Sequence, residues 1–189
     1  YTGCTKDRQM QCMASSSDGL IFSKSEQNPV IAEPPPEINP HDFRDPKVWK
    51  QSDLWYMVTG VSTLKNHFAT AEDDQFRSQG KVCLHRSTHL KNWELVKYLV
   101  ESSGELGSML ECPNFFPLDG KWVLMYSPMG LQERQVVYLT GDFDEQTGNF
   151  QWQTMGSVDL GFDFYAPQHF RDEKGRDLWS EMHRVISSL

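Results

Sequence analysis

A proline-centred motif recurs three times in this chain, and this internal repeat restricts the possible folds more than any other feature. The copies are Arg44-Asp45-Pro46-Lys47-Val48-Trp49, Leu110-Glu111-Cys112-Pro113-Asn114-Phe115-Phe116 and Tyr165-Ala166-Pro167-Gln168-His169-Phe170. Their prolines are 67 and 54 residues apart, which is the size of one four-stranded propeller blade with its loops. The match is loose, because Asp45 directly precedes its proline whereas Glu111 stands two residues before its own.

The rest of the chain has the pattern of an all-β protein, in which short aromatic and β-branched runs alternate with turn signals. The expected strands cover residues 12–14, 20–23, 54–59, 81–85, 93–100, 122–126, 136–140 and 150–154, and no long helix is expected. After Gly175 the sequence lacks the apolar strand that the repeat requires. We therefore predict a β-propeller of which residues 1–189 contain about three blades. A non-repeating β-sandwich, in which similar turns recur by chance, is the alternative.

The register of the repeat predicts that the first blade is incomplete. Tyr1-Thr2-Gly3 matches Val58-Thr59-Gly60, which belongs to the second strand of its repeat. Because a propeller needs four or more blades to close, we expect residues 1–189 to be part of a larger propeller domain. Isolated, such a fragment is expected to self-associate through its open blade edges.

Charge and cysteine content exclude several other classes of protein. With 18 Lys and Arg against 26 Asp and Glu, the net charge is -8 and no basic cluster stands out, so a nucleic-acid partner is not expected. Cys4, Cys12, Cys83 and Cys112 show no zinc-ligand spacing, which predicts buried free thiols and no metal site. No apolar run reaches the length of a membrane helix, and the cellular compartment stays open.

The repeat brings candidate catalytic residues together. The innermost strand of each blade lines a central channel, so Asp45, Glu111 and Tyr165 are expected to converge. Two carboxylates facing one pocket suit the hydrolysis of a glycosidic bond. Apolar neighbours in the sequence favour a desolvated Glu111, as a general acid requires. The alternatives are that Asp45 is a turn residue paired with Arg44 and that Glu111 is a solvated residue at a strand edge.

The ordered motifs in residues 43–46, 111–113 and 163–168 resemble three signatures of glycoside hydrolase family 32, which includes invertases, sucrose-phosphate hydrolases, inulinases and levanases. The resemblance spans roughly residues 1 to 175. It implies a five-bladed β-propeller, usually followed by a β-sandwich that residues 1–189 do not contain. It also implies cleavage of β-fructofuranosyl bonds with retention of configuration and without a cofactor.

Residue roles follow from the same resemblance. Glu111 is the implied acid/base, and Asp45 the implied transition-state stabiliser. The other implied substrate contacts are Arg44, Cys112, Tyr165 and Gln168. The family's nucleophile lies in an Asn-Asp-Pro-Asn motif that this sequence lacks, so we expect it upstream of Tyr1 and expect the isolated fragment to be inactive.

Two other functions stay open at this point. A carbohydrate-binding propeller without hydrolytic activity would share this scaffold, and a fructosyltransferase would share the same residues. The preferred fructoside also stays open. The candidate contacts for a phosphate group are Lys65, Arg77, Lys81 and Arg86, none of which the sequence distinguishes from a surface charge.

Overall fold

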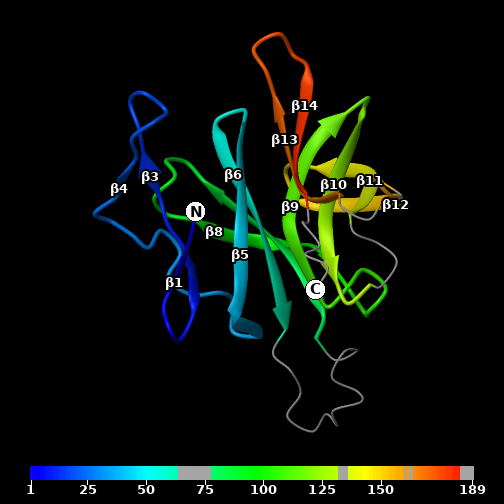
Figure 1. Cartoon of the computed structure of the whole chain (residues 1–189), viewed down its shortest axis with the longest axis horizontal. Coiled ribbons are helices and arrows are strands. Elements are labelled where there is room, and N and C mark those ends of the chain that lie inside the picture. Colours follow the sequence, from blue (N-terminus) through cyan, green and yellow to red (C-terminus); the bar gives the residue numbers. More distant parts are fainter. Residues whose placement is uncertain (64–77, 132–135, 160, 162–163, 184–189) are drawn as a thin grey trace, which may run out of the picture.

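The computed structural model describes residues 1–63, 78–131, 136–159, 161 and 164–183, and all regular structure in these residues is β (Figure 1). Among them, no helix is long and apolar enough to cross a membrane. The strands in chain order are β1 (Thr2–Cys4), β2 (Gln9–Gln11), β3 (Ala14–Ser15), β4 (Ser23–Lys24), β5 (Ile38–Gln51), β6 (Leu54–Thr63), β7 (Gly80–Ser87), β8 (Glu94–Glu101), β9 (Met109–Leu118), β10 (Lys121–Met129), β11 (Val137–Asp144), β12 (Asn149–Ser157), β13 (Phe164–Arg171) and β14 (Asp177–His183).

The strands form two complete blades with partial blades on either side. Strands β5 to β8 make one four-stranded antiparallel sheet, and β9 to β12 make a second with the same up-and-down order. Strands β1 to β4 form two short hairpins before them, and β13 pairs with β14 after them. The described residues therefore give a sector of a propeller and do not close its ring.

The expectation that no strand follows Gly175 is wrong, because β14 pairs with β13 along its length. The sequence of β14 contains several polar residues, and this is compatible with a strand because an antiparallel strand needs apolar contacts on one face only. Trp179 supplies them by packing edge-on against Phe116, with ring centroids 5.3 Å apart. Asp177, by contrast, accepts hydrogen bonds from the guanidinium of Arg171 at 2.9 and 3.0 Å.

The proline-centred motif forms the same β-bulge in each inner strand. In β5 the pairing advances three residues, from Arg44 to Lys47, while β6 advances two, from Gly60 to Val58. The same three-for-two shift occurs in β9 and in β13. Proline fits here because it has no N–H to donate, and each inner strand is both bulged and at the edge of its sheet.

The bulge corrects the alignment of the three motifs. Its extra residue lies in the left-handed region in every copy, with φ of 59° at Asp45 and 49° at both Cys112 and Ala166. Asp45 is therefore the structural counterpart of Cys112 and not of Glu111. The equivalent positions one residue earlier are Arg44, Glu111 and Tyr165.

The largest core cluster fills the space between the two complete blades. It is built from inward-facing side chains of both sheets, among them Val58, Leu84, Phe115, Leu124 and Leu139. The blades approach closely at Gly60, where a Cβ atom would lie 2.0 Å from the carbonyl oxygen of Leu110. The glycine on β6 thus allows the backbone of β9 to approach β6 at Leu110, the residue before Glu111.

A buried histidine predicts how the fold responds to acid. His85 on β7 is 3% exposed, and burial lowers the pKa of its imidazole from 6.5 to about 4. Between pH 6.5 and about 4, the imidazole of His85 therefore binds a proton in the unfolded chain but not in the folded chain. The contribution of His85 to the free energy of unfolding should be fully present above pH 6.5 and should be lost as the pH drops toward 4. The loss should be on the order of 3 kcal/mol.

Chemical denaturation followed by fluorescence between pH 7.5 and 4 would measure this loss. The control is His85→Leu, which replaces the titrating imidazole with an apolar side chain of similar size. We expect the variant to show a flatter dependence of unfolding free energy on pH. Equal slopes for the two proteins would contradict the assignment to His85.

Candidate active site

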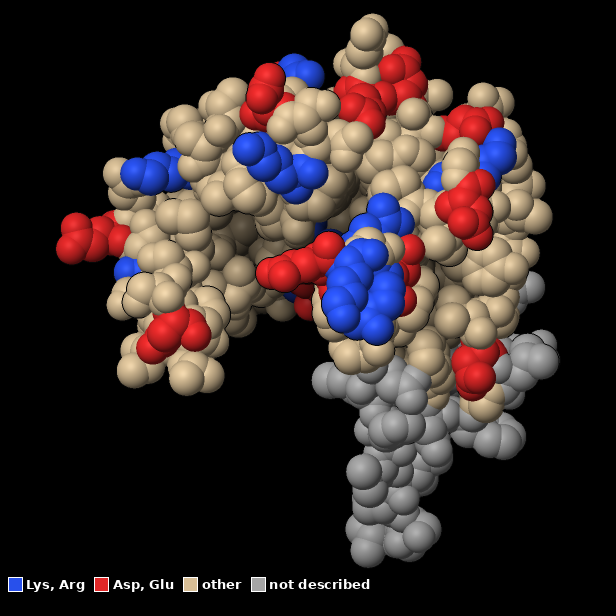
Figure 2. Space-filling model, turned by 90° about the horizontal axis from the view of Figure 1, so that it is seen from above, with Lys and Arg blue, Asp and Glu red and all other residues tan. Residues whose placement is uncertain are grey.

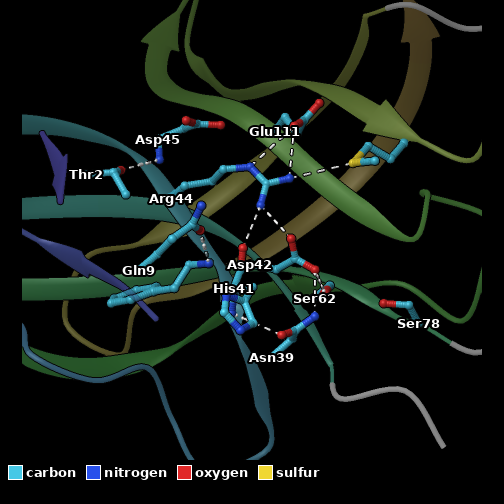
Figure 3. Close-up of polar contacts among 12 residues, drawn as sticks. Thr2, Gln9, Asn39, His41, Asp42, Arg44, Asp45, Ser62, Ser78 and Glu111 are labelled. Atoms are coloured by element: carbon cyan, nitrogen blue, oxygen red, sulfur yellow. Dashed lines mark hydrogen bonds and ion pairs between the residues drawn. The ribbon is translucent and has the colours of Figure 1, made fainter. Parts of the chain in front are cut away.

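Residues from three inner strands meet at the carboxylate of Glu111, and Figure 3 shows the side chains of two of them, Arg44 and Glu111, pointing toward one another. Its Oε1 atom accepts hydrogen bonds from Arg44 on β5, from Nη2 at 3.0 Å and from Nε at 3.3 Å. Its Oε2 atom accepts a hydrogen bond from the hydroxyl of Tyr165 on β13. The side chain of Glu111 is 19% exposed. Donors from both neighbouring blades therefore hold this carboxylate, and it is not a freely solvated residue at a strand edge.

The environment of Glu111 differs in kind from the one that its sequence neighbours predict. Met109 and Leu110 are buried, but the carboxylate itself meets a cation and a hydroxyl group. Arg44 also donates from Nη1 to Oδ1 of Asp42 at 2.5 Å. Burial alone would lower the pKa of the Arg44 guanidinium, but the hydrogen bonds and charges of Asp42 and Glu111 outweigh it and raise that pKa. Arg44 is thus a permanent cation between two carboxylates.

Asp45 lies within strand β5 and interacts with the next blade. Its Oδ2 atom accepts a hydrogen bond from the backbone N–H of Cys112 at 3.0 Å, with the thiol of the same residue 3.6 Å away. Its own N–H donates to Oγ1 of Thr2 at 3.1 Å. The alternative of a turn residue paired with Arg44 is therefore wrong. Because these contacts fix the side chain, Asp45 stands in a defined position one residue from Arg44.

The bond from Cys112 to Asp45 follows from the absence of a side chain at Gly60. In the next blade, the bulge amide of Ala166 donates to Oγ of Ser127 at 3.0 Å. Ser127 lies on the second strand of its blade, and Gly60 holds the equivalent place one blade earlier. Glycine offers no hydroxyl group, so the carboxylate of Asp45 accepts from the amide instead.

The remaining predicted residues have different outcomes. Gln168 is exposed on β13 and stays a predicted substrate contact, while Asp163 lies outside the described residues. Sequence reasoning missed the role of Asn114, whose Nδ2 donates to the carbonyl of Pro167 at 2.9 Å and whose Oδ1 accepts from the N–H of His169 at 3.0 Å. The available signal was the position of Asn114 directly before Phe115 and Phe116. An amide buried among apolar residues needs hydrogen-bond partners, which here are backbone groups of the next blade.

The carboxyl groups of Glu111 and Asp45, with the donors that hold them, suit proton transfer and the stabilisation of charge. Within the part of the chain that the structure describes, no three His, Cys, Asp or Glu side chains are grouped to hold a metal. Figure 2 shows positive and negative side chains interspersed on the face it displays, which has a hollow with acidic side chains at its edge. Of two carboxyl groups held side by side, one can donate a proton when it is protonated, and the other can stabilise a cation when it is ionised.

Comparison with known proteins agrees with this geometry. The model of the glycosyl hydrolases family 32 N-terminal domain matches residues 1–185. The chain belongs to glycoside hydrolase family 32. Sucrose-6-phosphate hydrolases of Zymomonas mobilis and Bacillus subtilis are 36% and 35% identical to this family 32 chain, and each alignment covers 93% of it. The chain spans 35% and 37% of the length of these two relatives.

Solved structures of the family share the fold. A GH32 β-fructofuranosidase of Bombyx mori is 37% identical with a TM-score of 0.78, over 93% of this chain and 37% of that one. A fructofuranosidase of Schwanniomyces occidentalis, solved with fructose, is 32% identical with a TM-score of 0.70, over 95% of this chain and 33% of that one. The predicted all-β propeller fragment is confirmed.

The thiol of Cys112 provides a chemical test of the site. Burial, followed by the charges of Asp45 and Glu111, raises the pKa of Cys112 to about 12. Because the thiolate is the reactive form, Cys112 should react with iodoacetamide at pH 8 at least tenfold more slowly than the exposed Cys4. Mass spectrometry of quenched samples would measure both rates.

Asp45→Asn is the matched variant for this test. It removes one negative charge and leaves the side-chain shape, so alkylation of Cys112 should accelerate by several-fold while that of Cys4 stays constant. Equal rates for the two thiols in the unmodified protein would show that Cys112 is not enclosed as described.

Proposed function

We propose that the intact polypeptide is a retaining glycosidase that cleaves the β-fructofuranosyl bond of sucrose-type substrates. The observation that carries the proposal is the Glu111 carboxylate, held at both oxygens in a member of family 32. The relatives support the substrate class, because they are named sucrose-6-phosphate hydrolase and β-fructofuranosidase. A mutant of the Bombyx mori protein has been solved in complex with sucrose.

In the proposed first step, Glu111 donates its proton to the oxygen of the leaving sugar as a nucleophilic carboxylate attacks the anomeric carbon. In the second step Glu111 removes a proton from a water molecule whose oxygen attacks the anomeric carbon, and the bond to the nucleophilic carboxylate breaks, so fructose is released with retained configuration. The sequence has no Asn-Asp-Pro-Asn motif. In this proposal the nucleophile comes from a part of the polypeptide outside residues 1–189.

Asp45 is proposed to stabilise the positive charge that develops on the fructosyl ring. The bond from the amide of Cys112 holds Oδ2, and among the described residues no donor is bound to Oδ1. A fixed negative group beside a forming cation lowers the barrier because it needs no reorganisation during the reaction. Arg44, Tyr165 and Gln168 are proposed to contact sugar hydroxyl groups around it.

Selection between sucrose and sucrose phosphate depends on further residues. Lys81 forms an ion pair with Glu101 at 2.7 Å, and Arg86 forms one with Glu94 at 3.0 Å. These two cations are already neutralised, which disfavours them as phosphate ligands. The other two candidates, Lys65 and Arg77, lie outside the described residues. An assay of the intact protein on sucrose, sucrose phosphate, inulin and levan would identify the substrate.

Glu111→Gln in the intact protein should lower the kcat for sucrose by about 10²–10⁴-fold, because the variant keeps the shape and loses the proton donor. The fold should be nearly unchanged in a denaturation experiment. A fructoside with an activated leaving group should lose less activity, since its departure needs less protonation. Activity within a few-fold of the parent would contradict the role of Glu111, and equal losses on both substrates would indicate a structural role.

Asp45→Asn should lower kcat by about 10²-fold or more with a smaller change in KM, because its charge matters most in the transition state. Steady-state kinetics on sucrose would separate the two parameters. If KM rises while kcat survives, Asp45 is only a ground-state contact.

The assay also separates the rival functions. A carbohydrate-binding propeller without catalysis would bind the sugar and release no fructose. A fructosyltransferase would release glucose in excess of free fructose, because part of the fructose passes to a sugar acceptor.

A further inference from the structure

Asp42 is a second acidic partner of Arg44 and lies on the other side of its guanidinium from the proposed catalytic carboxylate (Figure 3). Its Oδ1 atom accepts the hydrogen bond from Nη1 of Arg44 at 2.5 Å. Its Oδ2 atom accepts from Oγ of Ser62 at 2.6 Å and from Nδ2 of Asn39 at 3.0 Å. The side chain is 26% exposed. Both oxygens of Asp42 are therefore held in place, and among the described residues its hydrogen bonds reach Glu111 through Arg44.

The proposed acid step requires Glu111 to hold a proton, yet Glu111 is bound by a cation, and Asp42 can offset the effect of that cation. A general acid must hold its proton before the first step. The cation of Arg44 and the hydroxyl of Tyr165 both bind the oxygens of Glu111, and contacts of this kind in general stabilise a carboxylate over a carboxylic acid. A second carboxylate on the same guanidinium places a negative charge where it partly cancels the effect of the cation.

We propose that Asp42 is a positioning residue that holds Arg44 between two carboxylates and thereby preserves the protonated form of Glu111. The inference rests on the proposed function, because it concerns the acid step of that reaction. Asp42 has no part in the motifs from which the site residues were predicted. Its role follows from its bonds to Arg44, Ser62 and Asn39.

The other ionisable groups around Glu111 do not provide the same compensation. Among the described residues they are Asp45 on β5, Tyr165 on β13 and Cys112 on β9 itself. The Cys112 thiol is neutral at working pH, because burial and then the charges of Asp45 and Glu111 raise its pKa to about 12. Asp45 bonds to the amide of Cys112 and leaves the guanidinium of Arg44 to Asp42 and Glu111.

The test is the pH profile of kcat/KM for sucrose, measured on the intact enzyme. Asp42→Asn should shift the basic limb toward lower pH by about 0.5–1 unit, because Arg44 then acts on Glu111 alone. On that limb the variant should be about three- to tenfold less active than the parent, with little loss at the acid side. Asp42→Glu keeps the charge and should restore the parent profile.

Tyr165→Phe is the opposite control, since it removes a donor that favours the ionised Glu111, and it should move the same limb toward higher pH. An unchanged profile for Asp42→Asn, or an equal loss at every pH, would overturn the inference. If Asp42→Asn does not fold, Asp42→Ser replaces it in the same comparison. Failure of both neutral variants to fold would assign Asp42 a structural role and overturn the inference too.

The proposed function fails separately from this inference. An unmodified enzyme that releases no fructose, or a Glu111→Gln variant that stays active, would reject the proposed function itself. A parent that is active and depends on Glu111, together with an Asp42→Asn variant of unchanged profile, would reject only the role of Asp42.

Discussion

The inner strand of every blade is an edge strand, and its unpaired backbone groups must be satisfied by other partners. In this chain those partners are side chains of the preceding blade. Gln9 and Gln11 bind the N–H and the carbonyl of Phe43 at 2.9 and 2.8 Å. Asn114 binds two backbone groups of β13 in the same manner. Side-chain amides thus take the place of strand pairing between blades and set how adjacent inner strands are aligned.

The candidate site is built from this same interaction. At the bulge of β9 the partner of the Cys112 amide is the carboxylate of Asp45, because Gly60 has no side chain to offer. One residue therefore satisfies the backbone of the next blade and places a negative charge at the site. The close approach of the two blades at Gly60 and the position of Asp45 are consequences of the same glycine.

The ionic groups of the site form a chain of alternating charge across two blades. Asp42, Arg44 and Glu111 follow one another, and Tyr165 ends the chain from a third blade. Partly buried charges of this kind contribute little to stability, because their desolvation offsets much of their attraction. The contacts instead hold the side chains of Arg44 and Glu111 in a fixed orientation at the candidate site.

The sequence by itself predicted most strands of the two complete blades, the repeat and the inner-strand motifs that carry the candidate site residues. Aromatic and β-branched runs, turn signals and prolines are local, so they predicted β6 to β8, β10 to β12 and the three inner-strand motifs without tertiary information. Tertiary structure decided which residues are equivalent and which meet. The bulge aligned Arg44 with Glu111, and only the folded chain places Arg44 between the carboxylates of Asp42 and Glu111. Contacts between residues 67 positions apart depend on the register between blades, which spacing along the chain does not specify.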